Sequence, residues 1–571
     1  MYAFLAAILL LSCGVNMCQA MDATKFANTL KDFATNGMGV DALQAHYDGL
    51  SYTTKDVDGA ALISDLSSDI GETFSILTAA ATNIKLAVEE NYASFESDLS
   101  SGMTSCCDVR GESNLKFQSN ISFTAPCWTV SPKSPVEKKF PNAAVGSVME
   151  SNYEANSNKL LWQYFGSENG TSILYPQAKV STTSCESFDP RFRPYYATAA
   201  TPMAKDIVVL VDTSPSMHNT DNTGRTRLKL AKEVATTTLQ TLNPNDRFAV
   251  VTFDPNSYKP TSGCYADQLS LYTPDNERFL SKFIGHIDVT GNSDINVGLE
   301  AAFHYFQNSS APTEDDERSQ VILVLSDGAD FPSTRSPLDV IRDENAKLRN
   351  RVVIMVYGLG NDLVPGTSAE LMLRNISVQS RNNPAAGTTK PGFYENIDIA
   401  EAVRSKMGSY YSFFKSSSTT AVVSDPFIDT FSSIGLLISV CLPAYDKTDL
   451  DILLGVACAD VKLSDLFSKA AVFNEGDLSY VFIIDSKGRT LSHPLLPLSR
   501  TVKTSYTQLD ISYLERSEEA APVIEAMKRK ESGNQVVHSS TRTMARGVVL
   551  NEGIITRKVK STYYYAPVSI K

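Results

Sequence analysis

The residues with the clearest chemical potential stand next to apolar runs. Asp212, Ser214 and Ser216 alternate directly after one such run, so a carboxylate and two hydroxyls can face one point. Asp327 follows a later apolar run, and Ser293 precedes a helical pattern between the two. All of these side chains offer oxygen, the ligand type that Mg²⁺ and Ca²⁺ prefer. The sequence therefore predicts a site for one divalent cation, Mg²⁺ or Ca²⁺.

The same residues also have ordinary structural roles. Asp212 and Ser214 are common turn formers, and Ser293 could cap the helix that follows it. Asp327 could be a simple loop residue. Ligands bind at the carboxyl ends of the strands in a doubly wound sheet, so the joint placement favours the cation site.

The sequence lacks the motifs of common enzyme classes. It contains no Gly-x-Ser-x-Gly elbow, no His-Glu-x-x-His and no P-loop, and its six histidines are scattered. The formal net charge is −13, and no long run of Lys and Arg stands out. We therefore expect a protein that is not an enzyme and does not bind nucleic acid.

The middle of the chain alternates between strand and helix patterns. Continuous apolar runs, typical of strands buried on both faces, occur at 207–211, 248–253, 321–325 and 352–357. Helical patterns occur at 228–242, 295–306 and 337–349. This alternation predicts an α/β fold with a doubly wound parallel sheet.

The two flanks have different patterns. Residues 22 to about 100 repeat apolar side chains at helical spacing, which indicates a long, partly exposed helical hairpin. After about 410, strand-like runs at 435–440, 453–458 and 480–485 predict a separate α+β module. The strand-like ending at 563–568 suggests that this last module is incomplete.

Several features predict a secreted protein. Residues 3–11 form a short apolar run, and Cys18 and Ala20 stand at the −3 and −1 positions of a cleavage site, so residues 1–20 are expected to be a signal peptide. Asn-X-Ser/Thr glycosylation sequons occur at Asn120, Asn169, Asn308 and Asn375. Seven of the nine cysteines follow the signal, and this odd number implies a free thiol or an external partner.

No later run is long and apolar enough to cross a membrane, and no hydrophobic tail for a lipid anchor is present. We expect the protein to be secreted or held at the extracellular face of the plasma membrane, with no membrane anchor within this chain.

The predicted cation site resembles the metal-ion-dependent adhesion site of von Willebrand A domains. The first motif of that family, Asp-x-Ser-x-Ser, is complete here as Asp212, Ser214 and Ser216. Ser293 stands where the family has threonine, and Asp327 matches its second aspartate. Pro215 occupies a position where glycine is common.

The resemblance extends over nearly the whole chain. The segments Leu160–Phe165 and Asp189–Tyr196 are similar to the region before the A domain in alpha-2/delta auxiliary subunits of voltage-gated calcium channels. The segments Ser424–Asp429 and Leu454–Asp460 are similar to the Cache module of that family. In that family the A domain is inserted within a double Cache fold, so the resemblance implies that 110–200 packs with the region after 410.

The resemblance implies a domain order. It places a signal peptide at 1–20, a helical segment at 21–105, part of a Cache-type fold at 106–204, the A domain at 205–400 and a Cache-type domain at 410–571.

The resemblance also implies a role. An alpha-2/delta-like subunit would bind the pore-forming subunit from outside, through an acidic residue in an extracellular loop, and promote surface expression and current. A metal-dependent adhesion or matrix-binding protein is the alternative.

Related Cache modules bind free amino acids, and the matching positions here are Arg193, Tyr195, Asp429 and Asp460. A guanidinium can pair with the carboxylate of such a ligand. Tyr195 replaces the usual tryptophan, and Phe427 replaces the usual tyrosine. The alternative is that Arg193 and the two aspartates form structural ion pairs.

Overall fold

The computed structural model describes only part of the chain. The described residues are 23–50, 58–95, 103–131, 141–179, 188–220, 224–253, 259–261, 265–291, 294–309, 318–328, 335–379, 392–397, 403–414, 420–429, 431–450, 452–466, 479–497, 499, 502, 508–544 and 554–568. The expected signal peptide at 1–20 lies outside them. The chain divides into two compact units, Met1–Gly59 and Ala60–Lys571, and each is considered by itself.

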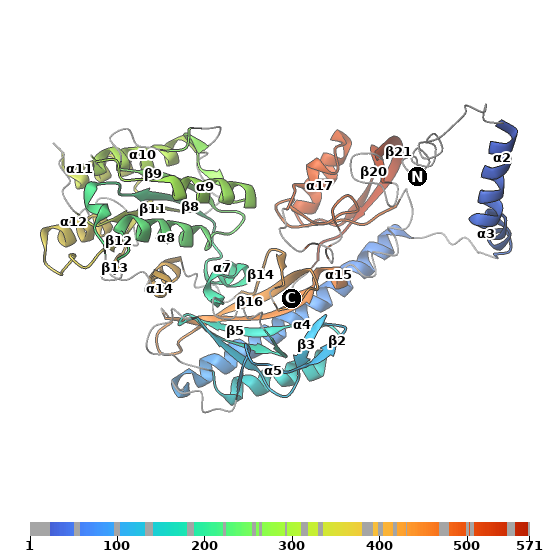
Figure 1. The fold of residues 1–571 in the computed structure, drawn as a ribbon, viewed down its shortest axis with the longest axis horizontal. Helices are drawn as coiled ribbons and strands as arrows, with labels where there is room; N and C mark the ends of the chain where they lie inside the picture. Colours follow the sequence, from blue (N-terminus) through green and yellow to red (C-terminus); the bar gives the residue numbers. More distant parts are fainter. Residues whose placement is uncertain are drawn as a thin grey trace, which may run out of the picture. The chain divides into compact units, whose positions relative to one another are not determined.

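The first unit is helical. It contains α2 (Ala23–Asp32), the π-helix η1 (Phe33–Gly37) and α3 (Val40–Asp48) (Figure 1). Phe26, Leu30 and Phe33, which share a face in the sequence pattern, are all exposed.

The middle of the second unit is a six-stranded sheet with the order β10-β9-β8-β11-β12-β13. All neighbours in it are parallel except the edge pair β10 and β9. Its strands are β8 (Lys205–Val211), β9 (Arg247–Thr252), β10 (Ser270–Leu271), β11 (Ser319–Ser326), β12 (Val352–Leu359) and β13 (Tyr394–Ile397). The predicted doubly wound parallel sheet is confirmed, with two short edge strands that the sequence pattern did not reveal.

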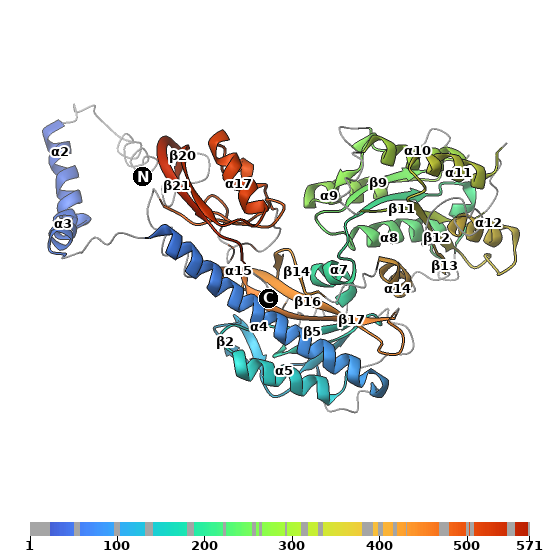
Figure 2. The same cartoon turned by 180° about the vertical axis from the view of Figure 1, so that it is seen from behind.

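Helices cover both faces of this sheet (Figures 1 and 2). Val208 and Leu210 of β8 pack in one apolar cluster with α10, α11 and α12, whereas Ile207 and Val209 pack in another with α8, α9 and α14. Burial on both faces explains why the strands are continuous apolar runs. The helices are α8 (Arg227–Leu239), α9 (Pro274–His286), α10 (Ile295–Asn308), α11 (Pro337–Lys347), α12 (Ser368–Ser377) and α14 (Val403–Phe414).

A second sheet combines strands from before and after the six-stranded one. Its order is β1-β4-β6-β5-β17-β16-β14, and β15 also pairs with β16. The central contact is antiparallel, between Gln163–Ser167 and Leu453–Lys462. The strands are β1 (Thr104–Ser105), β4 (Cys127–Val130), β5 (Gln163–Ser167), β6 (Thr171–Tyr175), β14 (Val422–Val423), β15 (Phe427–Ile428), β16 (Leu436–Tyr445) and β17 (Leu453–Lys462).

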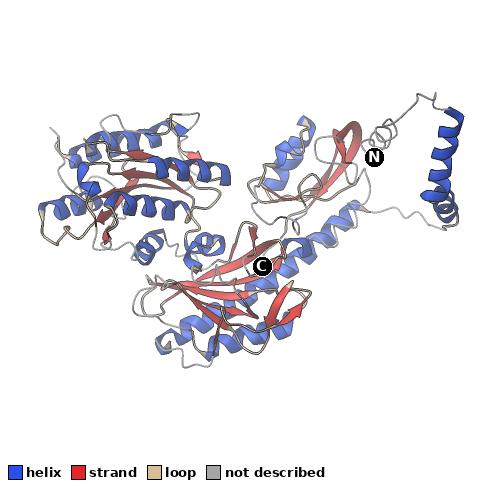
Figure 3. Cartoon of the chain, viewed as in Figure 1, coloured by secondary structure: helices blue, strands red, loops and turns tan. Residues whose placement is uncertain are grey.

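One long helix covers a face of this second sheet (Figure 3). The expected helical hairpin is wrong for this stretch, because α4 runs without interruption from Gly59 to Asn91. Its apolar residues recur every three or four positions and no proline breaks them, so nothing in the sequence forces a turn. The other helices packed with this sheet are α5 (Ala143–Asn156), α7 (Pro194–Ala200) and α15 (Leu463–Leu466).

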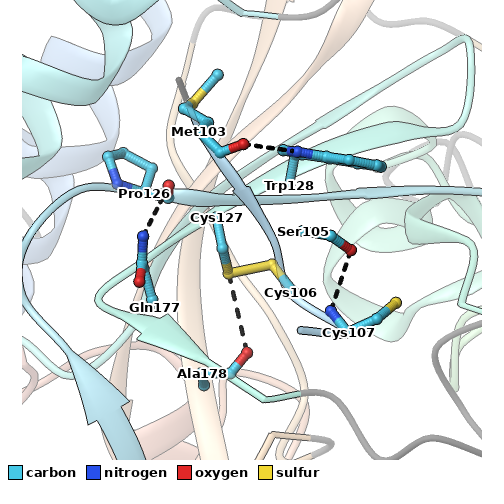
Figure 4. Close-up of a disulfide and its surroundings, with 9 residues drawn as sticks. All are labelled: Met103, Ser105, Cys106, Cys107, Pro126, Cys127, Trp128, Gln177 and Ala178. Atoms are coloured by element: carbon cyan, nitrogen blue, oxygen red, sulfur yellow. Dashed lines mark hydrogen bonds between the residues drawn. A yellow bond between two sulfur atoms is a disulfide. The ribbon is translucent and has the colours of Figure 1, made fainter. Parts of the chain in front are cut away.

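Two disulfide bonds link strands or strand ends of the second sheet. Cys106 bonds Cys127, and Cys441 bonds Cys458 across the paired strands β16 and β17. Cys107 is also disulfide-bonded. Around the first bridge, the Trp128 indole donates to the Met103 carbonyl at 3.0 Å (Figure 4). The predicted oxidising compartment agrees with these bridges.

The remaining elements are short strands, 3₁₀ turns and the C-terminal module. A three-stranded sheet contains β2 (Glu112–Asn114), β3 (Ser119–Ser122) and β7 (Gln177–Ala178). The C-terminal module contains β18 (Ile483–Ile484), β19 (Thr490–Ser492), α17 (Ala521–Lys528), β20 (Gly533–Met544) and β21 (Ile554–Tyr565). The 3₁₀ turns are η2 (Tyr92–Ser94), η3 (Pro190–Phe192), η4 (Pro215–His218), η10 (Ile511–Tyr513) and η11 (Glu518–Ala520). The run at 480–485 therefore yields a strand of only two residues.

Two surface features bear on the secretion hypothesis. Of the predicted sequon residues, Asn120 and Asn308 are exposed, and Asn169 and Asn375 are half-buried. Within the described ranges, no helix combines the length and apolarity needed to cross a bilayer.

A buried polar cluster holds the C-terminal module together. Glu515, 7% exposed, accepts hydrogen bonds from the hydroxyls of Tyr480 and Tyr563, both at 2.6 Å, and lies 3.0 Å from Nε2 of His493. The backbone N–H of Leu495 donates to Nδ1 of His493, so the imidazole proton lies on Nε2. Burial alone would raise the pKa of Glu515, but the hydrogen bonds from His493 and the two tyrosines outweigh it and lower the pKa.

We expect Glu515→Gln to lower the free energy of unfolding of this module by about 1–3 kcal/mol at neutral pH. The pKa of Glu515 is lower in the folded than in the unfolded chain. Its contribution to stability is therefore complete above the unfolded pKa and lost as the pH falls through the folded pKa. Thermal unfolding at about pH 7 and about pH 3.5 should show a gap between wild type and variant that narrows in acid.

The exposed Glu525→Gln on α17 is the matched control and should follow the wild type. A gap of equal size at both pH values would contradict the assigned role of the Glu515 carboxylate.

Candidate metal centre

Strand register brings the two predicted aspartates to one edge of the six-stranded sheet. β8 and β11 are parallel neighbours, with Val211 opposite Leu325. Asp212 therefore begins the loop after β8 beside Ser326, and Asp327 follows directly. The N–H of Asp212 donates to the Leu325 carbonyl at 2.9 Å, which fixes the start of the loop.

Asp212 is fully buried and held from both sides. Its Oδ1 accepts the Ser214 N–H at 2.8 Å, and its Oδ2 accepts the Ser326 hydroxyl at 2.6 Å. Burial raises the pKa of Asp212 to about 6, and the neighbouring Asp327 carboxylate adds to the rise, while the bonds from Ser326 and Ser214 oppose it. Two buried carboxylates this close favour a cation beside them.

The two serines of the first motif also converge. Ser214 and Ser216 have hydroxyl oxygens 2.9 Å apart. Pro215 begins the short 3₁₀ turn η4, whose N-cap is Ser214, and the short distance between the two hydroxyls places them on one side of this turn.

Ser293 lies outside the described residues. Its described neighbours are anchored to the same loops: Thr290 bonds Thr213 through both backbone (3.0 Å) and side chain (3.2 Å), and the N–H of Asp294 donates to the Phe253 carbonyl. The N-cap of α10 is Asp294, whose side chain accepts the Asn296 N–H. The capping role considered for Ser293 therefore belongs to the next residue.

The structure adds an arginine that sequence reasoning missed. Arg227, at the start of α8, donates to Oδ2 of Asp327 at 2.7 Å and also pairs with Asp362. Gly360 makes room for it, because a Cβ there would lie 2.7 Å from Nε of Arg227. Its partners are 100 and 135 residues away along the chain, so no local pattern marked it.

Gly328 shapes the loop that carries Asp327. Its φ of +70° lies in the left-handed region that glycine tolerates, and its N–H donates to the Ser326 hydroxyl. A Cβ at this position would also press against α12 at Ala369 and Leu373.

The donor chemistry fits a hard divalent cation. Within the described ranges, no group of three or more His, Cys, Asp or Glu side chains is placed to hold a metal ion. A cation at this edge would therefore rely on hydroxyl oxygens from Ser214 and Ser216 beside the two carboxylates. Such a set leaves the ion with few neutralising charges and open to a further oxygen ligand.

The second predicted site, in the other sheet, also comes together. Tyr164 donates to Oδ1 of Asp460 at 2.7 Å, contacts the Ser439 hydroxyl at 2.7 Å and packs its ring 4.4 Å from that of Tyr195. Oδ2 of Asp460 is buried and has no hydrogen-bond partner among the described residues. Burial raises the pKa of Asp460 well above its usual value, and the charge of nearby Asp429 adds to the rise.

Asp429 and Arg193 border the same region. Oδ2 of Asp429 accepts the Trp162 indole N–H at 3.3 Å, and burial raises the pKa of this carboxyl to about 6. The Arg193 guanidinium lies 4.6 Å from the centre of the Phe188 ring. The bonds named here come to the two aspartates from hydroxyl and indole groups.

Comparison with known proteins finds two kinds of similarity, one over the six-stranded sheet and one over most of the chain. Residues 207–329 match the family model of the von Willebrand factor type A domain. Over 96% of its length, the chain is 25% identical to the human voltage-dependent calcium channel subunit alpha-2/delta-4. The chain is a relative of the alpha-2/delta subunits. A rat relative, alpha-2/delta-3, is 23% identical over 90% of the chain.

The chain spans about half the length of these curated relatives, 49% of each. Among solved structures, a von Willebrand factor type A protein from Catenulispora acidiphila is 17% identical with a TM-score of 0.29, covering 45% of this chain and 57% of that one. Proximal thread matrix protein 1 from the mussel byssus is 19% identical with a TM-score of 0.27, covering 38% of this chain and 48% of the other. TM-scores this low add nothing to the interpretation of the site.

We expect Arg227→Met to destabilise the A domain in the presence of a chelator by about 1–3 kcal/mol, since Asp327 would keep its burial and lose its guanidinium. Thermal unfolding in EDTA measures this. The exposed Lys229→Met, two residues along the same helix, is the control. Identical melting of the two variants would show that the ion pair does not support the cation edge.

Proposed function

We propose that this chain is an extracellular, non-enzymatic auxiliary subunit of alpha-2/delta type, which binds the pore-forming subunit of a voltage-gated calcium channel and promotes its surface expression and current. The observation that carries this proposal is the similarity to alpha-2/delta subunits over 96% of the chain. A single shared domain would leave many adhesion proteins as alternatives, whereas similarity over nearly the whole chain favours this family.

The cation edge of the A domain is the proposed contact with the channel. Ser214, Ser216 and Ser293 would supply hydroxyl oxygens to Mg²⁺ or Ca²⁺, with Asp212 and Asp327 providing the negative charge. When bound, the ion supplies a positive centre that an acidic side chain from an extracellular loop of the channel can reach. Asp212 keeps its loop in place through the bonds to Ser214 and Ser326, and Arg227 holds Asp327.

We expect Asp212→Ala to abolish binding of Mg²⁺ and, with it, Mg²⁺-dependent binding to the channel, because the buried carboxylate is lost. In the wild type, Mg²⁺ at a hundred times its Kd should raise the free energy of unfolding by about 2.7 kcal/mol. Thermal unfolding in MgCl₂ and in EDTA measures the stabilisation by Mg²⁺. Co-purification from membranes measures binding to the pore-forming channel subunit.

Two further variants keep this test sharp. Ser214→Ala with Ser216→Ala removes the hydroxyls and keeps the Asp212 carboxylate, so it separates cation binding from the folding of the loop. Asp339→Ala on the surface of α11 is the matched control, with a side chain that is 44% exposed. Equal Mg²⁺ stabilisation in wild type and in both site variants would overturn the cation site.

A second role is favoured by the buried carboxylate of Asp460. We propose that Arg193, Tyr195, Asp429 and Asp460 bind a free amino acid, with Arg193 facing its carboxylate and the aspartates its ammonium. The buried Oδ2 of Asp460 needs a donor, and an ammonium group would both donate to it and favour its charged form.

Thermal unfolding with a panel of amino acids tests this role. We expect at least one to stabilise the wild type, and Asp460→Asn to remove the effect because the amide carries no charge for the ammonium. Glu525→Gln, on the exposed face of α17, should leave the stabilisation intact. If no amino acid in the panel stabilised the protein, the proposed amino-acid site would be wrong.

A metal-dependent adhesion or matrix-binding protein is the alternative to a channel subunit. Mg²⁺ stabilisation without any channel in the co-purified material would favour this alternative.

A further inference from the structure

A cavity of about 470 Å³ lies at the edge of the A-domain sheet opposite the cation edge. Leu242 and Asn243, just before β9, form part of its wall, and so does Leu271, which pairs with the first residue of β9. The cation site follows the last residues of the strands, so the two regions are separated by the length of the sheet. Its volume is typical of small-molecule sites.

Four parts of the chain enclose the cavity. Besides the A domain, Phe192 and Pro194 line it from the segment η3–α7, Pro426 from the loop between β14 and β15, and Arg489 from the C-terminal module. Of the residues assigned to the amino-acid site, Arg193 lines this cavity, but Tyr195, Asp429 and Asp460 do not. The cavity therefore shares Arg193 with the amino-acid site and differs from it in its other lining residues.

The wall is held in place by hydrogen bonds across the junction. The side-chain amide of Asn243 donates to the carbonyl of Thr201, the residue after α7, at 3.0 Å, and the Asn243 backbone N–H donates to Asp246 Oδ2 at 2.7 Å. Asp246 is fully buried in an ion pair with Lys205 at 2.6 Å. Wall residues held in place in this way lose less conformational freedom when a ligand binds.

Arg489 supplies an unused hydrogen-bond donor. Its Nε donates to Asp485 at 2.6 Å and its Nη2 pairs with Asp425 at 2.7 Å. Its Nη1 is buried and has no hydrogen-bond partner within the described part of the chain. A buried donor without an acceptor is costly, so an acceptor oxygen from a ligand would stabilise this guanidinium.

Gln508 supplies an unused acceptor. It lines the same cavity, and its Oε1 is buried without a hydrogen-bond partner among the residues that the structure describes. A ligand that satisfies both groups must carry an acceptor for Arg489 and an N–H or O–H donor for Gln508.

Charges around the cavity balance. Arg489 stands between Asp425 and Asp485, Asp189 pairs with Arg191 at 2.8 Å, and Arg193 is the third guanidinium. Of the residues that line the cavity, Arg193 and Arg489 carry guanidinium groups and Asp189 and Asp425 carry carboxylates, so no net charge calls for an ionic ligand. Phe192, Pro194, Leu242 and Pro426 supply apolar wall.

We propose that this junction cavity binds a small uncharged molecule that carries a carbonyl-type acceptor, an N–H or O–H donor and an apolar body. The ligand would contact the A domain, the second sheet and the C-terminal module together. This site is independent of the cation edge and of the proposed channel partner.

Benzamide is the probe, because it combines a carbonyl, an N–H donor and an apolar ring without charge. Benzoate has the same ring and shape with a negative charge. Calorimetric titration of the full chain should give saturable benzamide binding in the millimolar range, at least about tenfold tighter than benzoate.

Two variants test the location. Arg489→Lys keeps a positive charge near Asp425 and Asp485 but replaces the three guanidinium nitrogens with one ammonium nitrogen, so the separate Nη1 donor is lost. Leu271→Trp, at a position 49% exposed, fills the cavity without disturbing a core. Each should weaken benzamide binding by about tenfold or more.

The controls match each variant in chemistry and exposure. Arg516→Lys is exposed, and Leu371→Trp replaces a side chain 47% exposed on α12 that does not line the cavity. Both should bind benzamide as the wild type does. If Arg489→Lys fails to fold, Leu271→Trp alone decides the location.

Three results would overturn the proposal. Benzamide could fail to bind at about 10 mM, which would leave the cavity to water. Benzoate could bind as tightly as benzamide, which would contradict the proposal that the cavity selects uncharged ligands. Binding could also survive Leu271→Trp unchanged, which would place the probe elsewhere.

Discussion

The antiparallel contact between β5 and β17 is the constraint on which the second unit depends. It pairs residues 163–167 with residues 455–459, so the six-stranded sheet, which lies between them in the chain, begins and ends at the second sheet. Gly455 makes the contact close, since a Cβ there would lie 2.2 Å from the Gly166 carbonyl oxygen. The six-stranded sheet is therefore inserted in the chain between strands of the second sheet.

Buried acids mark both candidate sites, and they share one electrostatic feature. Asp212, Asp429 and Asp460 are each nearly or wholly inaccessible, and the hydrogen bonds identified to them come from hydroxyl, indole or backbone N–H groups. Such donors replace part of the water that the buried carboxylates lose, but they do not neutralise the negative charge. Burial therefore raises the pKa values of the three aspartates. Asp327 differs, because Arg227 supplies a full opposite charge.

Much of this fold could be predicted from local sequence. The strands of the A domain are continuous Val, Leu and Ile runs because both of their faces are covered, and the carboxylate and two serines after β8 follow from spacing alone. Tertiary contacts were harder. Arg227 acquires its role from loops that only the folded sheet brings near, and the apolar run at 480–485 is mostly loop around a two-residue strand.

The helices show the same division between local and distant signals. The long α4 was recognisable as helix from its apolar spacing, but that spacing alone did not distinguish one continuous helix from a hairpin. Ser293, predicted from its place before a helical pattern and from the family resemblance, lies outside the described residues. The junction cavity could not have been predicted, since it draws its wall from four separated segments.

The ends of the A domain lie close together, and this has a mechanical consequence. Lys205, which opens β8, has its ammonium 5.6 Å from the centre of the Phe414 ring at the end of α14. A pulling force applied to the loop after Val211 would be transmitted along β8 to the contact between Lys205 and Phe414. The load would fall on the ladders that β8 shares with β9 and β11, where many hydrogen bonds resist shear simultaneously instead of opening in succession.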